Sequence, residues 1–310
     1  MKNPNPAILI CHHNDSDGIV SAMVCKDQLQ KQYPNANFEY LKFSYGMQEN
    51  LEQLKQFDSL YLVDASFSAD TMNALYEHYG EDFVWIDHHI SAITRLSKEN
   101  SFIEGLRSIT DSACKLCFRY FVGRKESLPV IVDLIDKWDM HRVESEDFQS
   151  MVVPANLIFM SFCDDIPSLD NLELLTTEGA KQAITTIGSL LKTSNDKRIA
   201  KEASKVFISQ TKHNIVAAIL NTQTFTSEAI EHFIKKQEAL EGISQKPEVA
   251  CVFNIFKQEG KLMVRASLYR LDSSPDTLNC ASIAETYGGG GHKSAAGFTT
   301  TLDTFQKDFL

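Results

Sequence analysis

The chain has 310 residues, of which 43% are hydrophobic and 23% are charged. This composition is ordinary for a globular protein of about two domains, large enough to form its core without disulfides or a structural metal. The formal net charge of −11 argues against tight binding to long nucleic acid, which requires a basic face and many phosphate contacts. The first apolar run, residues 7–11, is too short for an export signal or a membrane span. We therefore expect a cytoplasmic protein with reduced cysteines.

Short apolar runs alternate with helical patterns through roughly the first 125 residues. Strands are expected over residues 7–11, 38–43, 60–63 and 83–86, and helices over 18–29, 48–56 and 69–78. Strands that are separated by helices indicate a parallel sheet with right-handed crossovers. The first part of the chain is therefore predicted to be a doubly wound α/β domain.

The pattern becomes mainly helical after residue 111, with amphipathic helices expected over 178–191 and 197–208. A strand-rich section then begins, with strands over 214–220, 249–256 and 261–268 and a helix over 227–237. This order predicts a smaller α/β domain with a mixed sheet. We divide the chain into a domain of residues 1–160, a helical linker of residues 161–212 and a domain of residues 213–310.

Acidic and imidazole side chains stand at the ends of three predicted strands. His13, Asp15 and Asp17 follow the first strand, Asp64 follows the third, and the sequence Asp87-His88-His89 follows the fourth. The carboxyl ends of strands form the ligand crevice of an open α/β sheet, so these side chains are expected to converge. Histidine with several carboxylates is the ligand set of divalent-metal hydrolases.

Each of these segments also has a purely structural interpretation. A spacing of two places His13, Asp15 and Asp17 on one side of an extended chain, and Gly18 permits a tight turn into the following helix. Asp15, Asp17 and Asp64 would equally suit helix caps. Adjacent histidines at a strand end are harder to explain without ligands, and a preceding aspartate can orient an imidazole. By contrast, the lone pair Cys114 and Cys117 lies in a helical pattern and is expected to pack in the core.

A further aspartate is expected from the helical segment 129–140, which offers three candidates. Asp133 lies opposite the apolar face of this helix and is expected to be solvated. Asp136 and Asp139 both flank the apolar face, and the helical wheel slightly favours Asp139.

A glycine run near the C-terminus, residues 288–291, suits the binding of an anion. Glycines permit positive φ and close backbone approach, so that successive N–H groups can form an anion-binding nest. His292 and Lys293 add side-chain donors, and Arg265 and Arg270 on an upstream strand could meet further phosphate.

These segments together resemble the DHH phosphoesterase superfamily. Residues 13–18 match every defined position of its first motif, H-x-D-x-D-G, Asp64 matches its second motif, and Asp87-His88-His89 is of the type that names it. Residues 288–297 resemble the glycine-rich signature of the DHH-associated domain. The resemblance implies a metal-binding catalytic domain in residues 1–160, a substrate-binding domain in residues 213–310, and an active site in the cleft between them.

The resemblance also implies roles for single residues. His13, Asp15 and Asp64 would hold one metal ion, while Asp17, Asp64, His88 and a fourth-motif aspartate would hold a second, with Asp64 bridging the two. For the fourth motif the resemblance favours Asp136 over Asp139, and we select Asp136. Two Mn²⁺ ions are expected, with Mg²⁺ or Co²⁺ able to substitute, and they would share a hydroxide nucleophile. His89 would contact the scissile phosphate or assist the leaving oxygen.

The predicted substrate-binding residues are those of the glycine-rich signature and of the strand before it: Arg265, Tyr269, Gly289, Gly290, Gly291, His292 and Lys293. Several family members carry arginine where this chain has Tyr269. We expect this tyrosine to stack on a base or to contact phosphate through its hydroxyl.

The function implied by the resemblance is hydrolysis of short oligonucleotides or linear dinucleotides to mononucleotides, as in the nano-RNases. A cyclic-nucleotide phosphodiesterase and a phosphoadenosine-phosphate phosphatase are the alternatives within this class. A catalytically silent nucleotide sensor is the alternative outside it. Neither long duplex nucleic acid nor a membrane is an expected partner, and the resemblance leaves open whether the chain forms a homodimer.

Overall fold

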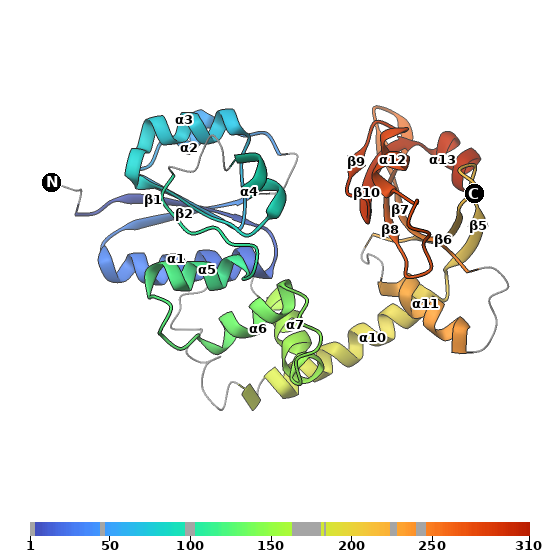
Figure 1. The fold of residues 1–310 in the computed structure, drawn as a ribbon, viewed down its shortest axis with the longest axis horizontal. Coiled ribbons are helices and arrows are strands. Elements are labelled where there is room, and N and C mark those ends of the chain that lie inside the picture. Colours follow the sequence, from blue (N-terminus) through green and yellow to red (C-terminus); the bar gives the residue numbers. More distant parts are fainter. Residues whose placement is uncertain are drawn as a thin grey trace. The chain divides into compact units, whose positions relative to one another are not determined.

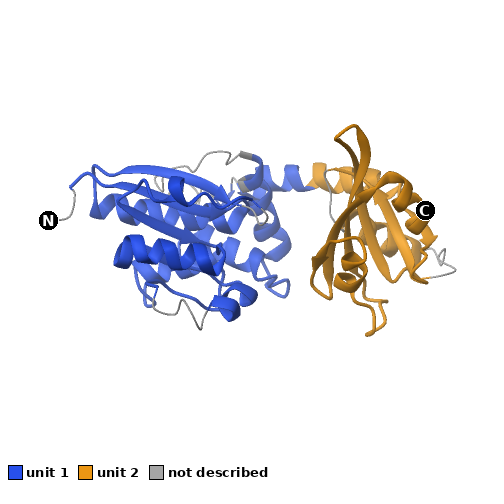
Figure 2. Cartoon of the chain, turned by 90° about the horizontal axis from the view of Figure 1, so that it is seen from above, with its two compact units in different colours: residues 1–192 blue, residues 193–310 orange. Residues whose placement is uncertain are grey.

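The computed structural model describes residues 4–43, 47–96, 103–162, 181–182, 184–223, 228–239 and 246–310. The chain divides into two compact units, residues 1–192 and 193–310 (Figure 2). The domain boundaries after residues 160 and 212 stay predictions. Among the described helices, none combines the length and the apolar character that a membrane span requires.

Unit 1 is built on a four-stranded parallel sheet in the order β2-β1-β3-β4. Its strands are β1 (Ala7–His13), β2 (Asn37–Phe43), β3 (Ser59–Val63) and β4 (Phe83–Ile86). Helices cover both faces of the sheet (Figure 1). The predicted doubly wound α/β fold is therefore confirmed.

The two faces of this sheet have separate apolar cores. Ile8 and Ile10 of β1 pack toward α1 (Ser16–Gln32) and α5 (Ala113–Phe121). Leu9 and Cys11 pack toward the other face, where α2 (Leu51–Leu54), α3 (Ala69–Tyr79) and α4 (Ile90–Leu96) lie. A short 3₁₀ turn, Gly80–Asp82, leads from α3 into β4. Cys114 and Cys117 are fully buried in the first of these cores, in agreement with the packing role predicted for them.

The order of the strands decides where ligands can bind. β1 pairs with β2 on one side and with β3 on the other, so the chain changes direction across the sheet between β1 and β3. Connections leave the carboxyl ends of these two strands in opposite directions and open a crevice there. His13 ends β1 and Asp64 follows β3, which places both residues at this switch point.

The other described elements of unit 1 are helices. They comprise α6 (Val130–Asp139), a π-helical turn (Phe148–Val152), α7 (Val153–Phe162), a second π-helical turn (Ile184–Gly188) and α10 (Ser189–Ala203), within which the division between the units falls. The predicted helix over 178–191 lies partly outside the described residues. The predicted helix over 197–208 is wrong at its end, because α10 stops at Ala203 and Phe207 begins a strand. That strand pairs antiparallel with β6 (Val216–Asn221), the next strand along the chain, with Phe207 opposite Ile219.

Unit 2 contains a six-stranded mixed sheet in the order β5-β6-β7-β8-β10-β9, as predicted for the second α/β domain. Only β6 and β7 pair in parallel. The strands are β5 (Phe207–Gln210), β6 (Val216–Asn221), β7 (Val249–Gln258), β8 (Lys261–Arg270), β9 (Gly290–Gly291) and β10 (Ala295–Thr301). One face packs against α12 (Cys280–Glu285) and α13 (Leu302–Phe309), and the other against α11 (Glu228–Ala239).

Candidate metal centre

Asp64 is the central residue of a cluster at the carboxyl ends of β1, β3 and β4. Its side chain is 1% exposed, and neither carboxylate oxygen accepts a hydrogen bond from any described residue. The imidazoles of His88 and His89 lie close to it, with His88 Nε2 3.3 Å and His89 Nδ1 3.8 Å from Oδ1. The backbone of Asp64 has φ 55°, a left-handed conformation that costs a non-glycine residue about 1–3 kcal/mol and is typical of functional sites.

The first group of potential ligands joins β1 to Asp64. His13, Asp15 and Asp64 each offer a ligand atom, and these atoms lie within 4.8 Å of one another. Asp15 is also the N-cap of α1, because its Oδ1 accepts the Gly18 N–H at 2.9 Å, while its Oδ2 lies 2.5 Å from His13 Nδ1. The predicted helix cap at Asp15 is therefore observed, and its carboxylate also lies among the potential metal ligands.

Gly18 allows this close arrangement. A Cβ atom at position 18 would lie 2.2 Å from the carbonyl oxygen of His13. The start of α1 can approach the end of β1 only without a side chain there, which keeps Asp15 and Asp17 beside the crevice.

A second group of potential ligands joins α1, β4 and α6. Asp17, His88 and Asp139 offer ligand atoms within 4.8 Å of one another. His88 Nε2 lies 3.7 Å from Asp17 Oδ2 and 3.3 Å from Asp139 Oδ2. The same nitrogen approaches Asp64 (3.3 Å), so the two groups adjoin at Asp64.

The structure brings Asp139, rather than Asp136, into the cluster. Asp136 is 2% exposed, and its Oδ1 accepts the Ser112 N–H at 2.9 Å. Its Oδ2 is held by Lys115 at 3.1 Å and by Arg142 at 3.3 Å. Because these partners occupy its carboxylate, Asp136 is absent from the groups of potential ligands in the described part of the chain. The helical wheel, which slightly favours Asp139, agrees with this placement.

Asp87 orients the ring of His89. It is fully buried, and its Oδ1 accepts the backbone N–H groups of His88 (2.7 Å) and His89 (3.1 Å). The same oxygen lies 2.8 Å from His89 Nδ1. The ring of His89 is thus fixed through one nitrogen, as expected for an imidazole that is oriented by a carboxylate.

The electrostatics of the cluster favour a cation. Burial, reinforced by the charges of Asp17, Asp15 and Asp139, raises the pKa of Asp64 well above its ordinary value. Burial and the nearby Asp17 and Asp15 raise the pKa of Asp139 to about 8. Burial alone would also raise the pKa of Asp15, but hydrogen bonds from His13 and the Gly18 amide outweigh it and lower that pKa.

The two cluster histidines respond in opposite ways. Burial lowers the pKa of His88 against the opposing charge of Asp17, so its ring is poised to remain neutral as a ligand must. The hydrogen bond that His89 donates to the Asp87 carboxylate raises the pKa of His89. His88 is therefore suited to coordination, while His89 is suited to carrying a proton.

The donor set fits divalent metal ions. Buried carboxylate oxygens without hydrogen-bond donors are costly unless a cation is supplied. Both oxygens of Asp64 and Oδ2 of Asp139 are buried and accept no hydrogen bond from the described residues. Mixed imidazole and carboxylate ligands suit Mn²⁺ and related ions. A third group of ligand atoms within 4.8 Å of one another joins Asp64, His88 and His89. The residues that could hold such ions are therefore His13, Asp15, Asp17, Asp64, His88, His89 and Asp139.

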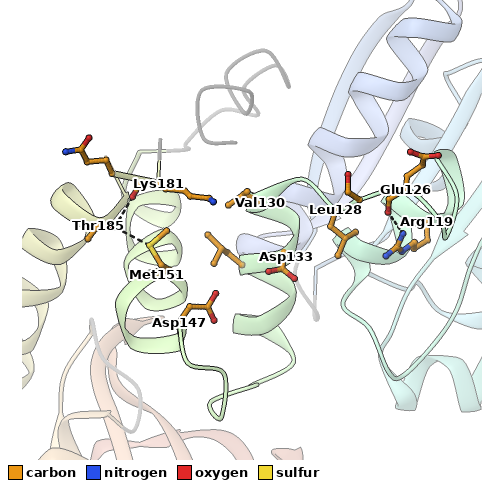
Figure 3. A pocket seen from close by; sticks show the side chains of 12 residues that line it. Arg119, Glu126, Leu128, Val130, Asp133, Asp147, Met151, Lys181 and Thr185 are labelled. Carbon is orange, nitrogen blue, oxygen red and sulfur yellow. Dashed lines mark hydrogen bonds between the residues drawn. The ribbon is translucent and has the colours of Figure 1, made fainter. Parts of the chain in front are cut away.

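A separate pocket of about 970 Å³ lies on unit 1 between α5, α6 and the π-helical turns (Figure 3). Two of its lining carboxylates, Asp133 and Asp147, both accept from Lys137 at 2.8 Å. This lysine neutralises them, and neither belongs to a metal-binding group among the residues that the structure describes. Asp133 is partly exposed, as predicted from its place on the helical wheel.

The predicted substrate-binding residues lie in unit 2. Gly290 and Gly291 form the edge strand β9, and a Cβ at Gly289 would lie 2.2 Å from the Gly297 oxygen. The N–H groups of Gly288, Gly289 and His292 donate to backbone carbonyls of Glu285, Ala284 and Ala295. Close packing of β9 against β10 thus accounts for part of the glycine run, and the exposed side chains of His292 and Lys293 remain available for an anion.

Arg265 and Tyr269 share a face of β8, opposite the core residues Val264, Ala266 and Leu268. The guanidinium of Arg265 is exposed and lies 5.4 Å from the centre of the Phe256 ring. Tyr269 is partly buried against the smaller core beside α11.

Sequence reasoning missed the contribution of α5 to the cluster. The N–H groups of Ala113 and Cys114 donate to Asp17 at 2.8 and 2.9 Å. Asp111-Ser112 before an apolar helical run is a usable start signal for such a helix. Nothing local, however, shows that its free amides meet a carboxylate almost a hundred positions earlier.

Comparison with known proteins agrees with this geometry. The family model for the N-terminal domain of the DHH family matches residues 7–137. Oligoribonuclease NrnB of Bacillus subtilis (strain 168) is 23% identical over 309 residues, which cover 95% of this chain and 73% of NrnB.

Solved structures share the fold. The DHH domain of a member of a ribosomal protein family has a TM-score of 0.60 at 13% identity, over 98% of this chain and 84% of that one. The pGpG-specific phosphodiesterase PggH from Vibrio cholerae has a TM-score of 0.50 at 12% identity, over 97% and 95% of the two chains. Residues 7–137, which carry the matched motifs and the doubly wound sheet, are thus similar to the N-terminal domain of the DHH family.

Proposed function

We propose that this protein is a divalent-metal-dependent phosphodiesterase that hydrolyses short oligonucleotides or linear dinucleotides to mononucleotides. The observation that supports it most is Asp64, whose two buried oxygens accept no hydrogen bond from the described residues. Asp64 belongs to two of the three groups of potential ligands, and its Oδ1 lies 3.3 Å from His88 Nε2 of the third. The names of two similar proteins, an oligoribonuclease and a pGpG-specific phosphodiesterase, support the choice of substrate. We propose Asp139 in place of Asp136 as the fourth-motif ligand.

The residues of the cluster divide the work of hydrolysis. His13, Asp15 and Asp64 would hold one ion, and Asp17, Asp64, His88 and Asp139 a second, most readily Mn²⁺. When bound, two such ions activate water and stabilise the charge that develops on the phosphoryl oxygens. His89, with its Nδ1 fixed by Asp87, would direct its other ring nitrogen to the scissile phosphate and supply a proton to the leaving oxygen.

His89→Ala should lower kcat by about 10²- to 10⁴-fold, the usual contribution of a positioned acid. The Mn²⁺ content of the purified variant should stay close to that of the wild type, because the two ligand sets proposed above do not use His89, although its ring lies within reach of Asp64 and His88. Metal content by elemental analysis, beside kcat on the same preparation, checks both parts. Because His89 Nδ1 also lies near Asp64, loss of an ion from this variant would make His89 a ligand instead.

The substrate-binding role proposed for unit 2 predicts a split between two substrates. If His292 contacts a phosphate other than the scissile one, His292→Ala loses one charge-assisted contact, worth roughly 1.5–3 kcal/mol. Its kcat/KM on pGpG should fall about 10- to 150-fold. Bis-p-nitrophenyl phosphate has no second phosphate, so its hydrolysis should be nearly unchanged.

His232 on α11, an exposed histidine of the same unit, provides the matched control. His232→Ala should leave kcat/KM for both substrates unchanged. An equal fall of both substrates in His292→Ala would assign this residue to the metal centre or to domain closure, and the phosphate contact would be rejected.

A substrate panel tests the proposed function directly. The purified protein is incubated with Mn²⁺ and, separately, with pGpG, a five-nucleotide RNA, a DNA of the same length, a long RNA, a cyclic dinucleotide and phosphoadenosine phosphate. We expect mononucleotides from pGpG and the short RNA, at rates far above those for the other substrates. Asp64→Asn serves as the inactive control. Binding of pGpG without turnover would identify a sensor, and preferential turnover of another substrate would replace the assignment.

A further inference from the structure

The start of α5 lies between two buried carboxylates that come from different helices. The first backbone N–H groups of a helix have no partner within it and attract negative charge. Here the Ser112 N–H donates to Asp136 of α6 at 2.9 Å. The next two N–H groups, of Ala113 and Cys114, donate to Asp17 of α1 at 2.8 and 2.9 Å.

This arrangement fixes the orientation of Asp17. Its two oxygens each accept one amide hydrogen, Oδ2 from Ala113 and Oδ1 from Cys114. The carboxylate therefore cannot rotate without breaking a hydrogen bond in a site where it is 1% exposed. Oδ2 also faces His88 Nε2 at 3.7 Å, so the position of α5 determines how Asp17 meets the ligand group that contains His88.

Asp136 holds α5 in that position. Besides the Ser112 amide, it binds Lys115 on the first turn of α5 at 3.1 Å and Arg142 beyond α6 at 3.3 Å. Asp136 stands three residues before Asp139 on α6, so the two lie about one helical turn apart. The same turn thus places Asp139 beside His88 and anchors the helix that orients Asp17.

We propose that Asp136 is a positioning residue for one of the two metal-binding groups, Asp17–His88–Asp139, and acts on Asp17 through the N-terminus of α5. The inference rests on the proposed metal-dependent function. The first group, His13–Asp15–Asp64, has no described contact with Asp136. Loss of Asp136 should therefore weaken one ion and spare the other.

Asp136→Asn is the most informative change. The amide keeps an oxygen that can accept the Ser112 N–H but loses the charge that holds Lys115 and Arg142. These two cations would then share only Asp111, at 2.5 and 3.7 Å. Residues that orient metal ligands typically change metal affinity by about 10- to 100-fold, and this is the loss that we expect at the Asp17 group.

The experiment is a Mn²⁺ titration of the metal-free protein. Binding is measured by calorimetry and by the electron paramagnetic resonance signal of paired Mn²⁺ ions. The wild type should bind two ions. Asp136→Asn should bind one ion with unchanged affinity and the second about 10- to 100-fold more weakly, with the paired-ion signal lost at equimolar metal. Asp133→Asn, on the same helix but 43% exposed and paired with Lys137, is the matched control and should behave as the wild type.

Arg142→Gln is a second variant that avoids the buried position, because Arg142 is 37% exposed. It should weaken the same ion by up to about fivefold, since a partly exposed ion pair contributes little. Melting of the metal-free proteins separates a role in folding from a role in positioning. A lower Tm with unchanged affinity for both ions overturns the inference.

The outcomes also separate this inference from the proposed function. Suppose that the wild type binds two ions. If Asp136→Asn then binds both with unaltered affinity, or loses both, the positioning role alone is overturned. A wild-type protein that binds no Mn²⁺ overturns the proposed function as well.

Discussion

Asp64→Asn is expected to abolish phosphodiester hydrolysis while the protein remains folded. The carboxylate adjoins both groups of potential ligands, so its loss should weaken both ions. If it contributes about 4 kcal/mol of transition-state charge stabilisation, its removal lowers kcat roughly 10³-fold. Asparagine is chosen because it preserves the size of the side chain and tolerates positive φ better than alanine does, and residue 64 has φ 55°.

The same substitution should stabilise the metal-free protein. Burial and neighbouring carboxylates raise the pKa of Asp64 above its unfolded value, so the folded chain retains a proton that the unfolded chain releases. The contribution of Asp64 to the stability of the metal-free wild type therefore falls as the pH rises above about 4. Asp139, whose pKa is raised to about 8, adds to this fall up to that pH. Asp64→Asn removes one contribution, and its advantage in Tm should be larger at pH 8 than at pH 5.

Thermal melting of metal-free and Mn²⁺-loaded protein at both pH values, beside kcat at saturating Mn²⁺, measures these effects. Mn²⁺ should raise the Tm of the wild type much more than that of the variant. Glu77→Gln, an exposed change on α3, is the control and should shift stability by no more than about 0.5 kcal/mol. Retention of most of the Mn²⁺-dependent activity by Asp64→Asn would contradict the two-ion assignment.

Asp139→Asn is expected to have the second-largest effect and tests the choice between the two aspartates of α6. Its Oδ2 lies 3.3 Å from His88 Nε2 and accepts no hydrogen bond within the described chain. Loss of this ligand should remove one of two bound ions and lower kcat by about 10²- to 10³-fold, comparable with the loss of one electrostatic group in other active sites.

Proton release gives an independent reading of Asp139. Because its pKa is raised to about 8, it is largely protonated at pH 7 in the metal-free protein, and an ion must displace that proton. Calorimetric Mn²⁺ titrations in two buffers of different ionisation enthalpy should show proton release in the wild type and less in Asp139→Asn. A variant with two ions and normal kcat would return the ligand role to Asp136.

Much of the fold and of the cluster could be predicted from the sequence because the signals are local. Three of the first four strands are short apolar runs and the strand over 38–43 alternates, and each prediction lies within about two residues of the observed bounds. The spacing of His13, Asp15 and Asp17 encodes convergence directly, since alternate residues of an extended segment point the same way. The carboxyl ends of parallel strands then bring Asp64 and His88 to the same crevice without further information.

Other features depended on pairing and packing against a neighbouring segment, which the local pattern of residues does not show. Phe207–Gln210 forms a strand because it pairs with β6, although its own pattern suits the end of a helix. The glycine run suggests an anion nest, but the close packing of Gly289 against Gly297 explains part of it. A sequence pattern cannot distinguish positive φ from the lack of space for a Cβ atom.

The sequence by itself determined the chemistry of the centre, because residue types and their positions after apolar strands are written in it. Only the tertiary structure decided between Asp136 and Asp139, which flank the same helical face. The decision came from their surroundings: Lys115, Arg142 and the Ser112 amide neutralise Asp136, whereas Asp139 faces His88. Those partners come from other segments, so the role of each carboxylate depends on how α5 and α6 pack together.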